Sequence, residues 1–156
     1  MLLINKIPSW VSLVKLALVL YAATAQAAVP GVCAFTAPEG WVQTKTRWEG
    51  ECRAGYAEGL GVLKEFEKQK VKRFFFGRIK NGGLERGVID QAEGYMAGDF
   101  ANGRAVPSVD RQRFIRAFAE AEKAAREAAT RFATAGNKAS ARFYQAKAKE
   151  LRQQMD

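Results

Sequence analysis

"WEGECRAGYAEGLGVL", residues 48–63, places four glycines and one cysteine within sixteen positions. A segment of this composition is a phosphate-binding loop, a set of β-turns or one copy of a structural repeat. A phosphate-binding loop needs a lysine and a hydroxyl residue after its last glycine, with a helix behind them. Here Gly61 is followed by the strand-like run Val62-Leu63-Lys64-Glu65-Phe66, which argues against nucleotide binding.

The spacing within this stretch favours a repeat. Trp48, Gly50, Cys52 and Gly55 lie at offsets 0, 2, 4 and 7. In a strand the first three share one face, so Gly55 marks a turn and the later glycines, Gly59 and Gly61, begin a return strand. The same offsets recur at Phe75, Gly77, Ile79 and Gly82, and again at Met96, Gly98, Phe100 and Gly103. Fixed internal spacing of this kind predicts three successive β-hairpins.

The pattern resembles the MORN (membrane occupation and recognition nexus) repeat, aromatic-x-Gly-x-aromatic-x-x-Gly-x-x-x-Gly-x-Gly. The first copy matches best, with Cys52 in place of the second aromatic. The second copy has Arg86-Gly87-Val88 where Gly-x-Gly belongs, one residue out of step, and the third has Met96 in place of its first aromatic and lacks the return glycines. The resemblance covers residues 41–106 and implies hairpins stacked into a twisted antiparallel sheet. It also implies scaffolding and, in some members, membrane association.

The N-terminus has the features of a cleaved secretory signal peptide over residues 1–27. Lys6 and Lys15 precede the apolar run "LALVLYAATAQA", and Ala25-Gln26-Ala27 forms an A-x-A cleavage site. The alternative is a retained membrane anchor, but the uncharged segment is shorter than the roughly 20 residues that a membrane span requires. We therefore expect a periplasmic or secreted protein.

Export changes the interpretation of the two cysteines. In an oxidising compartment, Cys33 and Cys52 are expected to form a disulfide that pins the N-terminal segment onto the first hairpin. A redox-active dithiol would have C-x-x-C spacing, which this pair lacks.

Beyond Pro107 the composition changes from glycines and aromatics to Ala, Arg, Lys, Glu and Gln. Ser108 is a favourable N-cap, and Asp110 in the first turn suits the helix dipole. An apolar stripe follows at alternating spacings of four and three residues, formed by Phe114, Phe118, Ala121, Ala125, Ala128 and Phe132. This periodicity predicts an amphipathic helix.

A second helix is expected from about Lys138 to Gln154, with Phe143, Ala146 and Leu151 on one face. The separating Ala135-Gly136-Asn137 is a stop signal, because glycine suits the left-handed position after a helix. So short a break predicts an antiparallel helical hairpin.

Charge gathers in the segment 64–80, which has seven basic residues against Glu65 and Glu67. The candidate binding patch in this segment comprises Lys70, Lys72, Arg73, Phe74, Phe76, Arg78 and Lys80. Strand alternation predicts a face of cations and aromatics suited to an anionic partner. The alternative is a solvated hairpin face whose phenylalanines are covered by the helical hairpin, and both interpretations stay open.

Catalytic and metal-binding chemistry has little support in the sequence. The chain has no histidine, the commonest general base and zinc ligand. Glu49 and Glu51 form a carboxylate pair, which the repeat explains as solvent-facing residues beside Gly50. We therefore expect no enzyme activity, no catalytic residues, no metal site and no cofactor.

The sequence thus predicts an exported α+β protein with a signal peptide (1–27), a sheet of MORN-like hairpins (28–106) and a basic helical hairpin (107–156). With 25 Lys and Arg against 16 Asp and Glu, the formal net charge is +9. The leading hypothesis is a non-enzymatic envelope scaffold that uses the sheet and the helices to bind. The alternative is an inhibitor or immunity-type protein that blocks an envelope enzyme or toxin.

The expected partner is a protein of the cell envelope, with anionic lipid or cell-wall polymer as further candidates. No nucleic acid is expected after export. A homo-oligomer formed through the helical hairpin is an additional hypothesis.

Overall fold

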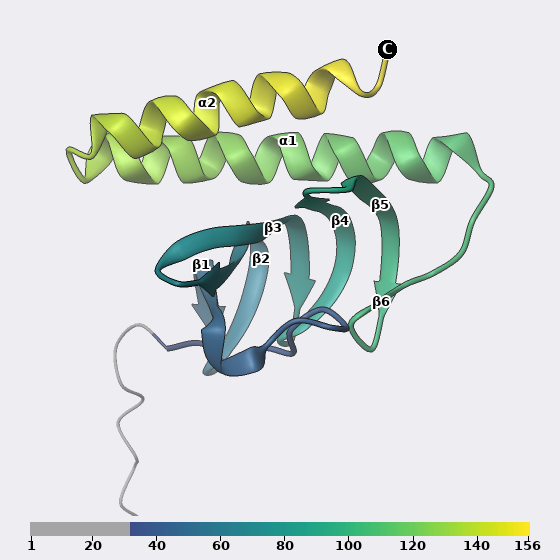
Figure 1. The fold of residues 1–156 in the computed structure, drawn as a ribbon, viewed down its shortest axis with the longest axis horizontal. Coiled ribbons are helices and arrows are strands. Elements are labelled where there is room, and N and C mark those ends of the chain that lie inside the picture. Colours follow the sequence, from purple (N-terminus) through teal and green to yellow (C-terminus); the bar gives the residue numbers. More distant parts are fainter. Residues whose placement is uncertain (1–31) are drawn as a thin grey trace, which may run out of the picture.

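A computed structural model describes residues 32–156 as an α+β fold, a six-stranded antiparallel sheet followed by two helices (Figure 1). The predicted fold class is therefore confirmed. The predicted signal peptide lies outside the described residues.

The strands lie in the sheet in the order of the sequence. They are β1 (Thr46–Arg53), β2 (Tyr56–Glu67), β3 (Lys70–Lys80), β4 (Gly83–Gln91), β5 (Gly94–Ala101) and β6 (Arg104–Ala105). A single 3-10 turn, η1 (Gln43–Lys45), precedes β1. The two helices are α1 (Arg111–Thr134) and α2 (Lys138–Gln153).

Three two-residue turns close the three predicted hairpins. They are Ala54-Gly55, Asn81-Gly82 and Asn102-Gly103, and both residues of each turn have positive φ. Such turns match the right-handed twist of paired strands, and Asn-Gly is the favoured sequence for them. Local turn chemistry therefore defines the hairpins at the positions expected from the repeat.

Five glycines form a continuous row across the sheet, paired as Gly50–Gly61–Gly77–Gly87–Gly98. The row leaves space for two large rings. The Trp48 ring lies over the first two glycines of the row, and the Phe75 ring lies beside the next two. Over Gly98 there is open space, because Met96 takes the place of a third aromatic and is exposed.

The register explains why Gly87 is out of step in the sequence. The β-bulge between β1 and β2 adds two residues to the return strand, whereas the one between β3 and β4 adds a single residue. Because the second bulge is one residue smaller, the glycine opposite Gly77 is Gly87.

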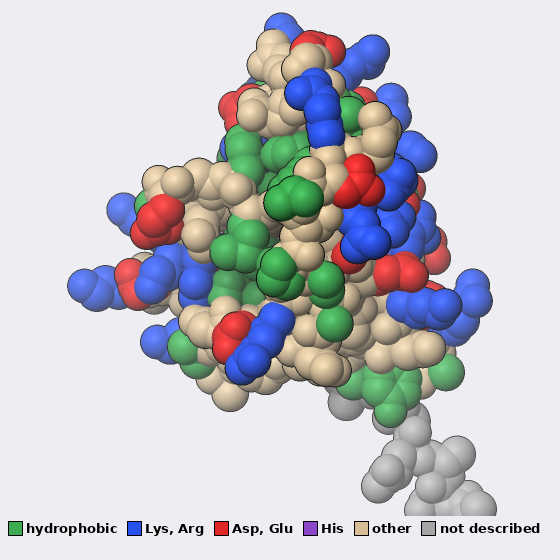
Figure 2. All heavy atoms as spheres, turned by 90° about the vertical axis from the view of Figure 1, so that its right-hand side faces the viewer, with side chains coloured by type: hydrophobic (Ala, Val, Ile, Leu, Met, Phe, Trp, Pro, Cys, Tyr) green, Lys and Arg blue, Asp and Glu red, His purple; other side chains and the backbone are tan. Residues whose placement is uncertain are grey.

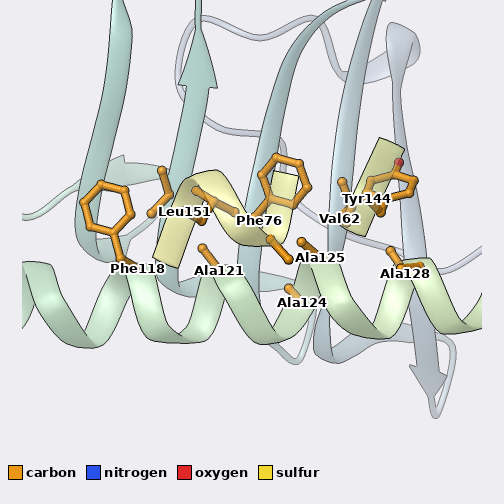
Figure 3. Close-up of a cluster of buried hydrophobic side chains, with 12 residues drawn as sticks. Val62, Phe76, Phe118, Ala121, Ala124, Ala125, Ala128, Tyr144 and Leu151 are labelled. Carbon is orange, nitrogen blue, oxygen red and sulfur yellow. The ribbon is translucent and has the colours of Figure 1, made fainter. Parts of the chain in front are cut away.

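The helices cover one face of the sheet. Helix α1 crosses β2, β3, β4 and β5 (Figure 1), and α2 packs along α1 while its inward side chains also reach the sheet, with Tyr144 at Glu49 and Lys147 at Asp90. Val62 and Phe76 from the sheet, Phe118 and the alanines of α1, and Tyr144 and Leu151 of α2 form the buried core between these layers (Figure 3). The sheet and the helical hairpin therefore share one core.

Residues 33–45, which we call the strap, cover the other face. Trp41 and Cys33 are buried in a second core with Leu63, Phe75 and Ile79. The strap also crosses the tips of all three hairpins (Figure 1): Ala34, Thr36 and Glu39 each donate a backbone hydrogen bond of 2.8 Å to the carbonyl of a turn glycine, Gly55, Gly82 and Gly103 respectively.

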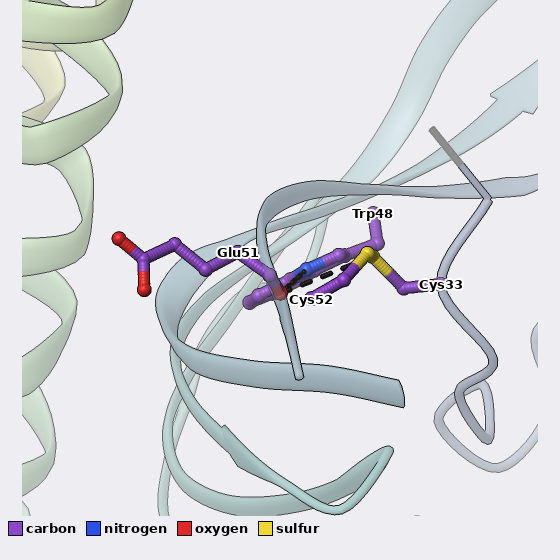
Figure 4. The surroundings of a disulfide bond; sticks show 4 residues. All are labelled: Cys33, Trp48, Glu51 and Cys52. Atoms are coloured by element: carbon purple, nitrogen blue, oxygen red, sulfur yellow. Dashed lines mark hydrogen bonds between the residues drawn. A yellow bond between two sulfur atoms is a disulfide. The ribbon is translucent and has the colours of Figure 1, made fainter. Parts of the chain in front are cut away.

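The expected disulfide is present and joins the strap to β1. Cys33 and Cys52 are linked with their Cα atoms 5.6 Å apart. Beside the bond, the Trp48 indole N–H donates to the Glu51 carbonyl at 2.9 Å (Figure 4). The prediction that the bridge pins the N-terminal segment onto the first hairpin is confirmed.

The helices begin and end close to the predicted positions, with corrections in detail. The N-cap of α1 is Asp110, whose side chain accepts from the Gln112 N–H at 2.9 Å, and not Ser108. At the far end the Asn137 N–H bonds to the Phe132 carbonyl and the Gly136 N–H to the Ala133 carbonyl, which is a Schellman motif.

The buried faces of the helices also differ from the expectation. On α1, Phe114 is 37% exposed at the outer end of the predicted stripe. The buried face of α2 is formed by Ala141, Tyr144, Ala148 and Leu151, while Phe143 and Ala146 are exposed. Tyr144, one residue beyond Phe143, faces the core instead.

Candidate anion-binding surface

The predicted aromatic and cationic face of β3 is covered in the structure. Phe76 is fully buried, and its ring meets that of Tyr144 on α2 with centroids 6.2 Å apart. Phe74 stacks on Phe76 at 5.4 Å and meets Phe143 at 5.6 Å. Of the two interpretations left open by the sequence, the structure agrees with the one in which the helical hairpin covers the phenylalanines, and Phe74 and Phe76 do not form an exposed binding face.

Three of the five cations of the predicted patch are paired with carboxylates. Arg78 bonds to Glu120 of α1 at 2.8 Å, and Lys72 bonds to Glu67 at 3.0 Å. Arg73 lies on the opposite face, where it pairs with Glu65. The two remaining members, Lys70 and Lys80, are exposed and make no ion pair within residues 32–156. The patch is thus divided between two faces and largely neutralised.

Arg73 and Glu65 belong to the contact between the strap and the sheet. The Glu65 carboxylate accepts from Arg73 at 2.7 Å and from the Val42 N–H at 2.8 Å, and the Arg73 guanidinium lies over the Trp41 ring. Burial alone would raise the pKa of Glu65, but these hydrogen bonds and the Arg73 charge outweigh burial and hold the pKa below its ordinary value.

Glu49 and Glu51 of the predicted carboxylate pair point to different partners. Glu49 pairs with Lys64 and accepts from the Tyr144 hydroxyl at 3.2 Å, which joins β1 and β2 to α2. Burial and the neighbouring Glu49 raise the pKa of Tyr144. The Glu51 side chain points toward α1 (Figure 4) and lines a shallow hollow with Lys123 and Arg126.

Two further carboxylates of the sheet are Glu58 on β2 and Asp90 on β4. Glu58 accepts from the Asn81 N–H at 2.8 Å, at a hairpin tip. Asp90 pairs with Lys147 of α2 at 3.0 Å. Glu51 and Glu58 lie opposite each other on β1 and β2, while Glu49 and Asp90 have partners elsewhere, and among residues 32–156 no group of three or more metal-ligating side chains gathers.

The outer face of α2 carries a row of four cations, with Gln145 in the gap between Arg142 and Lys149. Lys138, Arg142, Lys149 and Arg152 follow at spacings of four, seven and three residues, which places them on one stripe of the helix. All four side chains are exposed, and none takes part in an ion pair within the described part of the chain. The one acidic residue of α2, Glu150, is bonded to Lys147. We call these four residues the α2 cationic stripe.

The stripe was not identified from the sequence, although the signal was there. A helical projection of residues 138–153 places the four cations within one arc of the helix. Counting the charged residues of the hairpin gives its net charge but does not show this arrangement. They are unpaired because they lie on the face of α2 turned away from the sheet, whereas Lys147 on the opposite face of the helix pairs with Asp90 of β4.

Comparison of the chain with protein-family models, curated proteins and solved structures finds no significant match to any of them. The likeness to MORN repeats therefore stays a prediction from the sequence. Among residues 32–156, no helix is both long and apolar enough to span a membrane.

Proposed function

We propose that this chain is a non-enzymatic binding protein of the cell envelope, and that it engages an extended anionic partner through the α2 cationic stripe. The observation that carries the proposal is the stripe itself, whose four exposed cations make no ion pair with any carboxylate of residues 32–156.

The shape of the stripe suits an extended partner better than a small ion. From Lys138 to Arg152 it runs over 14 helical steps, or roughly 21 Å at the rise of an α-helix. Cations held at such spacing on a rigid helix attract repeated negative charges without an ordering cost for the backbone.

Both faces of the sheet are covered, by the strap and by the helices. The sheet therefore contributes to binding by holding α2 in place. Tyr144 bonds to Glu49 of β1, Lys147 bonds to Asp90 of β4, and Leu151 is fully buried. Burial lowers the pKa of Lys147, but hydrogen bonds to Glu150 and Asp90 outweigh burial and raise it. The sheet is in this proposal a scaffold, in keeping with the MORN-like pattern, and export follows from the predicted signal peptide.

The test is retention on immobilised heparin, used as a defined polyanion. Neutralising the stripe with Lys138→Gln, Arg142→Gln, Lys149→Gln and Arg152→Gln should weaken binding roughly tenfold or more, since exposed charges each contribute several tenths of a kcal/mol. The matched control replaces four exposed cations of the sheet side that make no ion pair within the described residues, Lys45, Lys68, Lys70 and Lys80, with glutamine.

The control variant has the same net charge as the stripe variant and should keep most of its retention. Equal losses from both variants would mean that net charge alone drives binding, and the assignment to α2 would be wrong. Binding of the native protein should weaken steeply as salt is added, because exposed charges are screened.

A further inference from the structure

The two edges of the sheet differ in how they are protected. At the β1 edge a bulge follows Gly50, and charged side chains alternate along the strand. Two carbonyls of β1 also accept side-chain hydrogen bonds, Glu49 O from Arg131 at 3.0 Å and Glu51 O from Trp48 at 2.9 Å. Bulges and charges of this kind keep an edge strand from pairing with another chain.

The β5 edge has none of these protections between Gly94 and Gly98. These five residues, Gly-Tyr-Met-Ala-Gly, include no charge and no proline, and their pairing with β4 has no bulge. Strand β6 pairs only with Phe100 and Ala101 of β5. Beyond this pairing, one backbone hydrogen bond reaches the outer side of β5, from the Val106 N–H to the Asp99 carbonyl at 2.8 Å.

The register shows which backbone groups are left open. The two-residue turn after Gln91 makes Gln91 and Gly94 a hydrogen-bonded pair. The backbone N–H and C=O groups of Gly94, Met96 and Gly98 therefore point toward β4. The N–H and C=O groups of Tyr95 and Ala97 therefore point outward, where no strand among residues 32–156 pairs with them. The edge offers four backbone hydrogen-bonding groups to another strand.

Apolar side chains gather around this edge. Met96 is 43% exposed, and Phe114 lies one helical turn from Phe118, whose ring meets that of Tyr95 at 5.7 Å. On this side of the molecule, hydrophobic side chains form a column with charged side chains to either side (Figure 2). An apolar surface beside an open strand edge is a feature of association sites.

Charge indicates which partner fits. The Gly94 end of the edge lies near carboxylates, with exposed Glu93 in the turn and Glu150 next to Tyr95. The other end lies near arginines, since Arg86 and Arg113 both bond to Asp99. An antiparallel copy of the same strand would bring each acidic end to the basic end of its partner.

We propose that the protein forms a two-fold symmetric dimer in which the β5 strands of two copies pair in antiparallel fashion. Tyr95 of each copy pairs with Ala97 of the other through four hydrogen bonds, and Met96 meets its own symmetry mate on the axis. Because this axis is perpendicular to the sheet, both helical hairpins lie on the same side of one continuous sheet. Self-association does not depend on the proposed anionic partner, but it would present two cationic stripes to one surface.

The experiment is sedimentation velocity on the purified, oxidised protein over a range of concentrations, with two variants of equal charge. Met96→Lys places a charge on the edge and should raise the dimer dissociation constant tenfold or more. Phe143→Lys is the matched control, since Phe143 is 44% exposed but lies on α2 away from the edge, and it should leave the dimer unchanged. Far-ultraviolet circular dichroism checks that both variants are folded.

A third variant, Met96→Cys, tests the register. Facing residues in a non-hydrogen-bonded pair lie close enough for a disulfide, so mild oxidation should link two copies of this variant. A protein that stays monomeric at every concentration, or equal dissociation of the Met96→Lys and Phe143→Lys variants, would overturn the proposal. A dimer in which Met96→Cys does not cross-link would overturn the register.

Discussion

At the scale of single residues, the first four glycines of the row, Gly50, Gly61, Gly77 and Gly87, are required by close approach and not by turn conformation. A side-chain carbon at Gly77 would lie 2.6 Å from the Cα of Gly87 and 2.8 Å from the Phe75 ring. Gly77→Ala should therefore lower the free energy of unfolding by about 1–3 kcal/mol, the usual cost of overpacking. Gly83→Ala is the control, because its new carbon meets only the Lys80 carbonyl at 3.5 Å. Urea denaturation measures both, and equal losses would contradict the close-approach explanation.

The Glu65 carboxylate makes stability depend on pH. Because its folded pKa lies below the ordinary value of 4.5, the ionised form contributes stability above that pH, and the contribution is lost as the pH falls through the folded pKa. Glu65→Gln should lower the free energy of unfolding by about 2 kcal/mol at pH 7 and flatten its decline in acid. Glu67→Gln, at an exposed pair, is the control and should change little. Denaturant titrations at pH 7 and pH 3 give the comparison, and an acid decline unchanged by Glu65→Gln would refute this role.

At the scale of elements, the strap depends on its disulfide. The bond closes a sequence separation of 19 residues, which corresponds to about 3 kcal/mol in the chain-entropy description. Adding reductant should lower the thermal midpoint of the native protein, whereas a Cys33→Ser, Cys52→Ser double variant should start lower and not respond. Differential scanning calorimetry with and without reductant measures this, and an unchanged midpoint on reduction would show that the hairpin-tip hydrogen bonds hold the strap alone.

Element boundaries were predictable where local chemistry decides them. Asn81-Gly82 and Asn102-Gly103 supply the two positive φ angles of a tight hairpin, and Gly136 supplies the left-handed residue that ends α1. The inward face of α2 was not, because Phe143 and Tyr144 are adjacent and both aromatic. Tyr144 faces inward because Glu49 accepts its hydroxyl and Phe132 stacks on its ring at 5.4 Å, and both partners belong to other elements, β1 and α1.

At the scale of the whole molecule, β2, β3 and β4 each contribute to both cores, and β3 contributes the largest side chains. The adjacent residues Phe75 and Phe76 are fully buried on opposite faces, one under the strap and one under the helices. Phe75→Ala and Phe76→Ala should each lower the free energy of unfolding by about 3–5 kcal/mol. Each variant should still unfold in one transition, with tryptophan fluorescence and far-ultraviolet circular dichroism changing together. Separate transitions for strap and helices would contradict a shared cooperative unit.

The sequence by itself determined the three hairpins, the two helices and the disulfide, because glycine conformations, helix caps and cysteine pairing are local or compartment-dependent properties. Only the tertiary structure decided which surfaces are free. Phe74 and Phe76 are covered because the helical hairpin packs on their face, and the strap covers the other face by bonding to turn glycines far along the chain. The stripe on α2 and the open edge of β5 are left exposed because they lie at the outer layer and the last full strand. Burial depends on which elements meet, and a pattern along one chain segment does not contain that information.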